Sequence, residues 1–363
     1  MNLKKLFLIL SGLIIIVGLF ITLLSKEYTA DNEYAKFFTD IESKIDSVKK
    51  IEIETTENAV YLFNKNGKWE IPGYENYPAS EEKVKKFLIT VVQLKGVDKK
   101  TKNPDLHEKL GLAFPLKQES IRIRLLDDEK NLISDFIIGN TSSHNEQFSY
   151  IREFDSEQTW LFKNEFDFKT TDIDWTEDSI LKIARWRIKS VKIEGSNKKS
   201  ENIYIYKDKY SDQSFKLDNI PDGFVLDPNF NLSNFASMLE SIKKLDIKSS
   251  ILNDKDNALR QIYFETFDGL IIKIKSFKSG DDIYYHFDVD SDIKVRKELD
   301  ENEPNIVGLP KMMTFEEIEE EKTKYNYLKN WYFKLYKDFN TGTNFTLQDL
   351  IVEKNSNYKL IRE

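Results

Sequence analysis

An uncharged apolar stretch near the amino terminus constrains this chain more than any other feature. The stretch runs from Leu6 to Leu24, 19 residues without a charged side chain. A helix of that length crosses roughly 30 Å of hydrocarbon at about 1.5 Å per residue. A cleavable signal peptide has a shorter apolar run and a small-x-small exit, whereas Tyr28 stands where the small residue before Ala30 would be. The stretch therefore predicts an uncleaved transmembrane signal anchor, and a cleaved signal peptide is the alternative.

The flanking charges predict how the anchor is oriented. Lys4 and Lys5 precede the stretch and favour a cytoplasmic amino terminus, although Lys26 on the far side reduces the asymmetry. We expect a single-pass protein of the bacterial inner (cytoplasmic) membrane, with an extracytoplasmic, periplasmic ectodomain. The predicted parts are a cytoplasmic stub (1–5), the anchor (6–24), a linker (25–42), a first α+β repeat (43–178), and a second α+β repeat with a C-terminal extension (179–363).

Charge and cysteine content exclude several classes of function. The chain holds 54 basic and 62 acidic residues. Without the two lysines that precede the anchor, the chain has 52 basic and 62 acidic residues, a net charge near −10. That balance disfavours nucleic acid as a partner. The absence of cysteine excludes disulfides, thiol catalysis, thiolate zinc sites and a lipid-anchoring cysteine.

The first half of the ectodomain has the pattern of an α+β unit. Alternating apolar residues predict strands from Val48 to Ile53 and from Val60 to Phe63. Asn66-Gly67 before Trp69 is a type I′ hairpin signal. Ser80 can cap a helix whose apolar face has the spacing i, i+3, i+4, i+7. That face is formed by Val84, Phe87, Leu88 and Val91.

A second half repeats this order. Asn231 or Ser233 can cap another helix. Its predicted face has the same spacing, displaced by 151 residues, and consists of Phe235, Met238, Leu239 and Ile242. Leu94 and Leu245 keep that offset, and apolar alternation predicts similar strands after each helix. The predicted fold is therefore α+β: an N-terminal transmembrane helix followed by two tandem repeats of mainly antiparallel sheet, each with a packed helix.

Motifs in a specific order give the chain a resemblance to a known family. They are Asn66-Gly67-Lys68-Trp69-Glu70-Ile71, Tyr77-Pro78-Ala79, Asn103-Pro104 with Lys109-Leu110-Gly111-Leu112, Ile138-Gly139, Tyr150-Ile151-Arg152, Asp174-Trp175 and Trp331-Tyr332-Phe333-Lys334-Leu335. With these motifs, most of residues 45–350 resembles the bacterial domain of unknown function 4340. The resemblance implies a membrane-tethered protein associated with ABC transporter components of the gliding-motility type. It implies no catalytic residue.

No catalytic, cofactor or metal site is predicted from the motifs. There is no GxGxxG or P-loop, and the histidines His107, His144 and His286 lie in separate segments without a metal motif. The aspartates Asp281, Asp282, Asp288, Asp290 and Asp292 form the densest acidic cluster. The last three alternate, so they would share one strand face and could bind a hard cation. A solvated strand edge that resists aggregation is the simpler interpretation.

Aromatic and basic residues leave two further alternatives open. The five tryptophans are Trp69, Trp160, Trp175, Trp186 and Trp331. They could form a sugar or lipid platform, although core packing is expected for most of them. Arg185-Trp186-Arg187 could bind an acidic partner or serve as a structural linker between the repeats. The run from Glu316 to Lys322 is expected to be the solvated face of a helix.

These observations predict a structural or interaction protein rather than an enzyme. We expect an extracytoplasmic accessory or scaffold protein that docks with a membrane protein partner, an ABC-type transport system. The alternatives are an envelope hydrolase that uses paired carboxylates and a module that binds lipid or glycan.

Overall fold

The computed structural model describes residues 35–36, 38, 41–117, 119–163, 167–195, 202–251, 258–297 and 308–354. The predicted anchor, residues 6–24, lies outside these ranges. Within them, no helix combines the length and the apolar character needed to cross a membrane. The described chain is strand-rich α+β, with mostly antiparallel sheets and few helices, which confirms the predicted fold class at that level.

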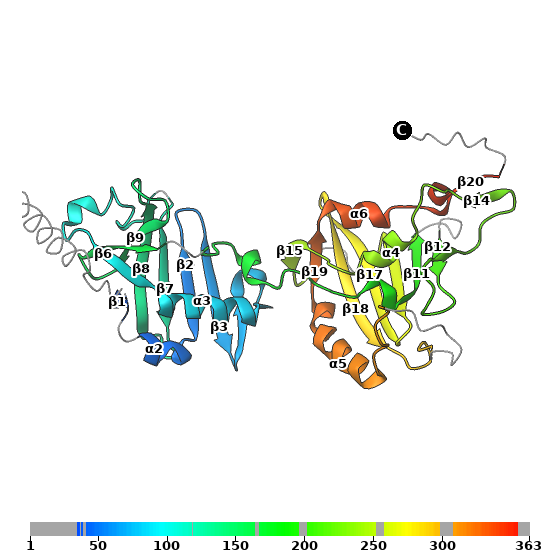
Figure 1. Ribbon diagram of the computed structural model, residues 1–363, viewed down its shortest axis with the longest axis horizontal. Helices are drawn as coiled ribbons and strands as arrows, with labels where there is room; N and C mark the ends of the chain where they lie inside the picture. The colour runs from blue at the N-terminus through cyan, green and yellow to red at the C-terminus, as the bar shows by residue number, and fades with distance from the viewer. Residues whose placement is uncertain are drawn as a thin grey trace, which may run out of the picture. The chain divides into compact units, whose positions relative to one another are not determined.

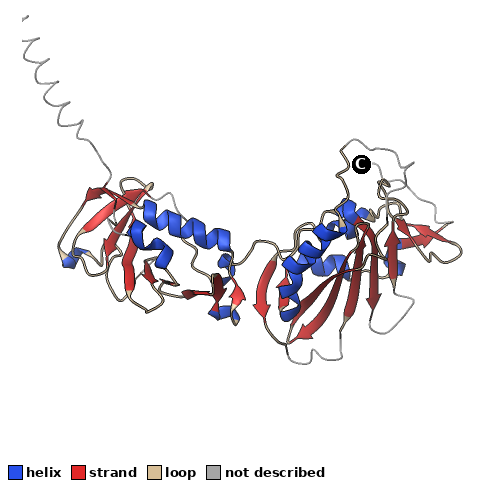
Figure 2. Cartoon of the chain, turned by 90° about the horizontal axis from the view of Figure 1, so that it is seen from below, coloured by secondary structure: helices blue, strands red, loops and turns tan. Residues whose placement is uncertain are grey.

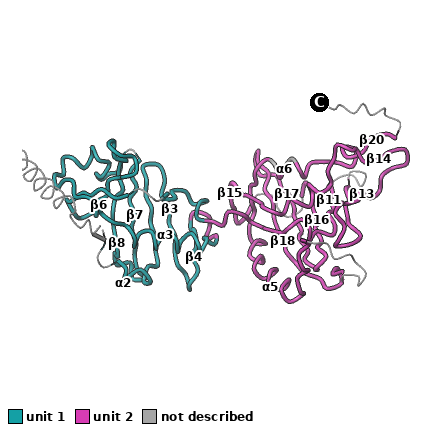
Figure 3. Tube along the Cα trace, in the orientation of Figure 1, with its two compact units in different colours: residues 1–72, 78–175 teal, residues 73–77, 176–363 magenta. Residues whose placement is uncertain are grey.

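The described residues divide into two compact units (Figure 3). The first comprises residues up to Pro72 and residues 78–175; the second comprises residues 73–77 and the chain from Thr176 onward. Each has a sheet with alternating buried and outward residues, as on β17, where Leu270, Ile272 and Ile274 are buried. This period of two puts one face of the sheet into the core.

The first unit is built on a ten-stranded sheet (Figure 1). Its strand order is β1-β6-β10-β9-β8-β7-β2-β3-β4-β5. The strands are β1 (Ala35–Lys36), β2 (Lys50–Glu54), β3 (Ala59–Lys65), β4 (Lys68–Ile71), β5 (Tyr77–Pro78), β6 (Lys95–Lys99), β7 (Ile121–Leu126), β8 (Leu132–Thr141), β9 (Phe148–Glu153) and β10 (Thr159–Lys163). Its α-helices are α2 (Ile41–Lys44) and α3 (Glu81–Gln93). Figure 2 shows the long helix α3 along one side of the strands, and Val84, Phe87 and Val91 on it are buried.

The predicted hairpin turn at Asn66-Gly67 is confirmed. It joins β3 to β4, and the φ angles of Asn66 and Gly67 are 54° and 83°. Two successive positive φ angles define the type I′ turn, which matches the right-handed twist of the strands. The Asn64 side chain supports the turn by accepting the backbone N–H of Gly67 at 3.0 Å.

Replacing Gly67 by alanine should lower the free energy of unfolding by about 1–2 kcal/mol. A Cβ at this position would meet no atom within 4 Å, so the cost is that of holding an L-residue at positive φ. Chemical denaturation of the purified chain measures this difference. Lys68→Ala, in the adjacent strand position, is the control with ordinary backbone angles, and equal stability of the two variants would contradict the assigned turn.

The second unit is built on an eight-stranded sheet with the order β13-β12-β11-β16-β17-β18-β19-β15. The strands are β11 (Ile188–Gly195), β12 (Ile203–Tyr206), β13 (Lys216–Leu217), β15 (Lys244–Lys248), β16 (Arg260–Thr266), β17 (Leu270–Ser279), β18 (Asp282–Ser291) and β19 (Tyr332–Leu335). A separate pair joins β14 (Phe224–Leu226) to β20 (Ile351–Glu353). The helices are α4 (Ser233–Ser237), α5 (Phe315–Tyr325) and α6 (Lys337–Thr343).

The two sheets share one strand order. Across the first sheet the strands run β6-β10-β9-β8-β7-β2-β3-β4, and across the second they run β15-β19-β18-β17-β16-β11-β12-β13. Corresponding positions hold strands of the same rank along the chain: of the eight strands compared in each sheet, three precede the helix α3 or α4 and five follow it. The edge strands β1 and β5 of the first sheet have no counterpart in the second. Every neighbouring pair of strands in these two orders is antiparallel.

The predicted second helix is wrong in its extent. α4 ends at Ser237, so Met238, Leu239 and Ile242 lie beyond it. Leu239 and Ile242 are buried, but their carbonyls accept the backbone N–H groups of Ile183 and Ile180, at 2.9 and 2.8 Å. These bonds to a distant segment take the place of the bonds that would continue the helix.

The surroundings of the two helices also differ in detail. Leu94 is buried whereas Leu245 is 42% exposed, so the two leucines, although they keep the offset of 151 residues, do not play the same part in their cores. Ser80 stands at the N-cap position of α3, but its side chain accepts no capping hydrogen bond. Asn231 does accept the backbone N–H of Ser233, at 3.0 Å, although the N-cap residue of α4 is Leu232.

Candidate functional site

A cavity of about 440 Å³ in the second unit is the candidate site. Its walls include Arg185, Trp186, Lys207, Tyr210, Gln213 and Phe215. The first two belong to a short 3-10 turn, Arg185–Arg187, which leads directly into β11. Lys207 follows β12, the strand that pairs with β11. In this antiparallel pair, the start of β11 lies beside the end of β12. The turn and Lys207 therefore meet at one end of the two strands, and the cavity forms there.

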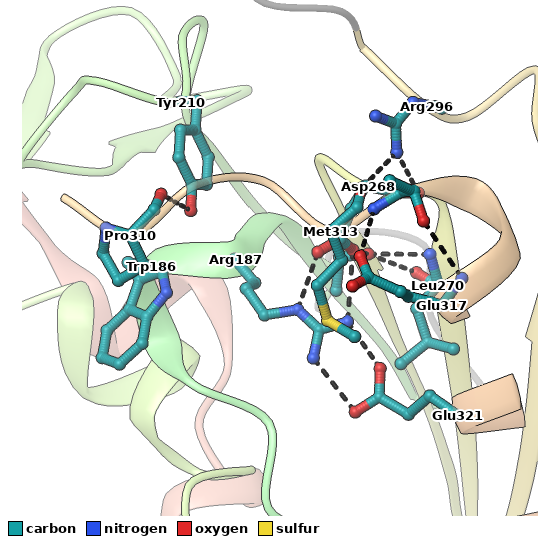
Figure 4. Close-up of polar contacts among 12 residues, drawn as sticks. Trp186, Arg187, Tyr210, Asp268, Leu270, Arg296, Pro310, Met313, Glu317 and Glu321 are labelled. Atoms are coloured by element: carbon teal, nitrogen blue, oxygen red, sulfur yellow. Dashed lines mark hydrogen bonds and ion pairs between the residues drawn. The ribbon is translucent and has the colours of Figure 1, made fainter. Parts of the chain in front are cut away.

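The turn buries its last side chain and exposes the first two. Arg187 is 8% exposed, whereas Trp186 is 39% exposed and Arg185 is also exposed. Arg187 donates from Nε to Asp268 Oδ2 at 2.8 Å and from Nη2 to Glu321 Oε2 at 2.6 Å (Figure 4). Burial lowers the pKa of Arg187, but the hydrogen bonds and charges of Glu321 and Asp268 raise it by more. The guanidinium therefore stays charged.

Asp268, fully buried, is held by a second layer of contacts. Thr266 Oγ1 donates to its carboxylate at 2.5 Å. Arg296 Nη1 donates to the Asp268 backbone carbonyl at 3.1 Å and to that of Met313 at 2.8 Å. Such a network fixes the position of the turn, because a buried charge without its partner is costly.

Glu321 comes from α5, whose start is also well defined. Thr314 and Glu317 form a capping box: Glu317 accepts the Thr314 N–H at 2.7 Å, and Thr314 Oγ1 accepts the Glu317 N–H at 3.2 Å. A capped first turn sets the helix register, and Glu321 is one turn further on. The prediction that Glu316 to Lys322 is a solvated face is therefore wrong for Glu321, which turns inward.

Lys207 brings a buried positive charge to the cavity wall. It is 5% exposed, and its Nζ donates to the Trp186 carbonyl at 3.2 Å. The same ammonium lies 5.3 Å from the ring centroid of Phe215 and 5.2 Å from that of Phe267. Tyr210, nearby, donates from its hydroxyl to the Pro310 carbonyl at 3.0 Å. The cavity thus combines a cation with aromatic surface.

Three side chains of the wall keep hydrogen-bond donors for a ligand. Arg185, Trp186 and Gln213 are exposed, and no side-chain hydrogen bond joins any of them to another described residue. The backbone N–H of Arg185 donates to Glu240 Oε1 at 3.2 Å. Asp212, the one carboxylate of the wall among the described residues, accepts the backbone N–H of Lys209 at 2.9 Å. The described wall therefore presents three side chains with free N–H donors and one carboxylate.

The three histidines have unrelated surroundings. His107 is buried and its Nε2 lies 3.0 Å from the Glu157 carbonyl, while His144 Nδ1 lies 3.3 Å from Ser143 Oγ. His286, on β18, lies 2.8 Å from the Lys329 carbonyl through Nε2. None of them lines the cavity.

The aspartate cluster lies on and around β18. Asp282 and Asp290 pair with Lys334 and Lys322, at 2.9 and 3.2 Å. Asp288 stands opposite Lys273 in the register. Asp292 follows the last strand residue, so the predicted shared face holds only two aspartates of the three. In the described part of the chain no group of three or more acidic or histidine side chains has a metal-binding arrangement.

The tryptophans divide between core and surface. Trp69, Trp175 and Trp331 are buried, at 6, 2 and 8% exposure, and Trp160 is half-buried. Core packing, expected for most of them, is thereby confirmed. Trp186 is the exposed exception, and it lies in the cavity wall.

Two carboxyl groups have pKa values raised by burial, Glu153 and Asp172. They belong to different elements, β9 and the 3-10 turn Asp172–Trp175. Asp172 Oδ1 is buried without a hydrogen-bond partner in the described residues. Neither residue was singled out by sequence motifs, and neither were Asp268, Lys207 or Tyr210, because their partners are distant in the chain.

The fold and the cavity define a strand-rich α+β protein with two sheets of matching strand order and a donor-rich hollow in the second unit. The chain matches the model of the family described as Domain of unknown function (DUF4340) over residues 69–261. Those 193 of 363 residues are more than half of the chain, and the chain belongs to this family. Searches of curated proteins and of solved structures returned no match.

Proposed function

We propose that this protein is a membrane-tethered, extracytoplasmic accessory protein that binds a membrane partner and does not catalyse a reaction. The observation that carries the proposal is the composition of the cavity wall. Among the described residues it offers cations, aromatic rings and free donors, but neither a histidine nor a second carboxylate beside Asp212. General acid–base chemistry needs a titratable group that can reach a substrate, and the lysine and tyrosine of the wall, Lys207 and Tyr210, instead donate to the carbonyls of Trp186 and Pro310. Binding needs only complementary surface.

The anchor and the family resemblance support the identity of the partner. The uncharged stretch at Leu6–Leu24 would tether the ectodomain beside other membrane proteins. Tethering raises the effective concentration of a binding module at its target. The resemblance implies an ABC-type transport system as that target, which we propose as the partner of this chain.

We also propose that the two units arose as tandem repeats of one α+β module. The support is the common strand order, which holds at all eight corresponding positions. A cavity walled by Arg185, Trp186 and Lys207 would then be a specialisation of the second repeat. The first repeat would provide a second surface.

Replacing the anchor by a cleavable export signal should impair partner capture while leaving protein abundance unchanged. The expected loss is on the order of a hundredfold, the lower range of avidity that tethering adds. Crosslinking in intact membranes, followed by purification of this protein, measures the captured fraction. The matched control carries an unrelated single transmembrane helix in place of residues 6–24 and should restore capture.

The enzyme alternative predicts a different result. Under that alternative, changing one histidine or carboxylate would abolish activity in cells while abundance and capture remain normal. His107→Gln, His286→Gln, Glu153→Gln and Asp172→Asn are the four substitutions to test, since these residues are buried, half-buried or have raised pKa values. One such loss would overturn the binding proposal.

A further inference from the structure

Three side chains of the cavity wall have hydrogen-bond donors that no described residue accepts. Arg185 carries five N–H groups, Trp186 one and Gln213 two, and no other described residue accepts from these side chains. We infer that the cavity binds an acidic polypeptide segment of the partner, with a carboxylate on Arg185 and an apolar side chain against Trp186. This inference rests on the proposed function, because it names the chemistry of the segment that the partner presents.

Charge contrast favours an acidic ligand. The whole chain carries a net charge of −8, yet the charged residues of the wall in the described part of the chain are Arg185, Lys207 and Asp212, which sum to +1. A local positive site on an acidic protein selects acidic groups at short range, because the overall charge repels them elsewhere. Arginine is suited to this role since its planar fork binds a carboxylate bidentately.

The size of the cavity favours a polypeptide over a small anion. A hollow of about 440 Å³ exceeds one water's share of liquid volume, about 30 Å³, by an order of magnitude. A single carboxylate or phosphate ion would leave most of it filled with solvent. An extended segment would also cover the exposed ring of Trp186, and burial of aromatic surface supplies much of the affinity at protein interfaces.

The cavity wall is organised before any ligand binds. Arg187, the last residue of the turn, pairs with Asp268 and Glu321. These ion pairs hold in place the turn that carries Arg185 and Trp186. Lys207 further ties this turn to β12 through the Trp186 carbonyl. A fixed wall loses less conformational entropy on binding, which favours affinity.

The test measures binding of two peptide pools to the purified full chain in detergent. One pool has glutamate at alternate positions and random residues between; the other has glutamine in place of each glutamate. We expect the glutamate pool to bind at least tenfold more tightly, since a hydrogen bond to a charged group contributes more than a neutral one. Its binding should weaken as salt is raised, because the charges are exposed.

Arg185→Gln should weaken binding of the glutamate pool about tenfold and leave the glutamine pool unchanged. Lys278→Gln removes the same charge from an exposed residue of β17 that does not line the cavity, and it should have no effect. Circular dichroism of both variants should match the parent chain, because neither side chain is buried.

Equal binding of the two pools would overturn the inference, as would an Arg185→Gln variant that binds like the parent. Competition by inorganic phosphate or free glutamate as effective as that of the peptide pool would show an anion site and overturn the polypeptide assignment. If the pools fail to bind but membrane capture still depends on the anchor, the inference fails and the proposed function stands. If the glutamate pool binds and capture is independent of the anchor, the proposed function fails instead.

Discussion

Replacing Arg187 by methionine should lower the free energy of unfolding of the second unit by about 3–5 kcal/mol. The substitution removes one partner of a buried ion cluster and leaves the carboxylates of Asp268 and Glu321 without it, at 1% and 14% side-chain exposure. Uncompensated buried charge has this cost because the groups have lost their hydration. Chemical denaturation of the purified chain, followed by tryptophan fluorescence, measures the change.

Arg185→Met is the matched control for this prediction. The residue type and the substitution are the same, two positions away in the same turn, but Arg185 is exposed and makes no side-chain ion pair with a described residue. Its effect on stability should stay within about 0.5 kcal/mol. Similar losses for the two variants would contradict the assigned directions of these side chains.

A double substitution separates the cost of lost packing from that of unpaired charge. Arg187→Met combined with Asp268→Asn removes one of the two stranded negative charges, so it should be less destabilising than the sum of the single changes. The expected coupling is about 0.5–3 kcal/mol, the range for residues in one network. An additive result would mean that Arg187 stabilises the fold through packing alone.

The sequence predicted local features of this fold well. The hairpin at Asn66-Gly67 needs two positive φ angles, and only a few residue types adopt them readily. Helix α3 follows from its apolar spacing, with Val84 and Phe87 both turned into the core. These signals lie within one element, so no distant contact is needed to interpret them.

Distant contacts explain why other features could not be predicted. α4 has the same apolar spacing as α3 but stops at Ser237, because Leu239 and Ile242 bond to the segment at residues 180–183. The two arginines of the turn have identical local chemistry, and their different roles depend on Asp268 and Glu321. Those partners stand 81 and 134 residues further along the chain, so no sequence spacing reveals them.

A contact between distant residues also connects two of the family motifs. In Tyr150-Ile151-Arg152, the Arg152 guanidinium donates to the Leu112 carbonyl at 2.8 Å and to the Ser156 carbonyl at 3.0 Å. Leu112 belongs to another of the quoted motifs. Arg152 thus joins two family motifs that are separate in the sequence, and burial lowers its pKa.

Tyr77→Ala should also destabilise the second unit strongly, by about 3–5 kcal/mol, the cost of truncating a large buried aromatic ring. Tyr77, the last residue of the segment 73–77 that belongs to the second unit, is 1% exposed. Its ring centroid lies 5.1 Å from that of Trp331, 6.0 Å from that of Tyr327 and 6.1 Å from that of Phe333. Tyr327 and Trp331 shortly precede β19, and Phe333 lies on it. The loss should therefore appear in the unfolding transition of the second unit.

Tyr77→Phe is the variant that tests the hydroxyl group alone, and its effect should depend on pH. Burial, followed by the charge and hydrogen bond of Tyr327, raises the pKa of Tyr77 well above its usual value near 10. The unfolded chain then loses this proton near pH 10 while the folded chain keeps it, so stability is complete below pH 10 and falls above it. Each such tyrosine contributes a slope of about 1.4 kcal/mol per pH unit.

Near pH 7 the phenylalanine variant should lose only about 1 kcal/mol, for the hydrogen bond. Between pH 10 and 11 its stability should fall less steeply than that of the parent chain, and parallel curves would show that Tyr77 ionises normally in the folded protein.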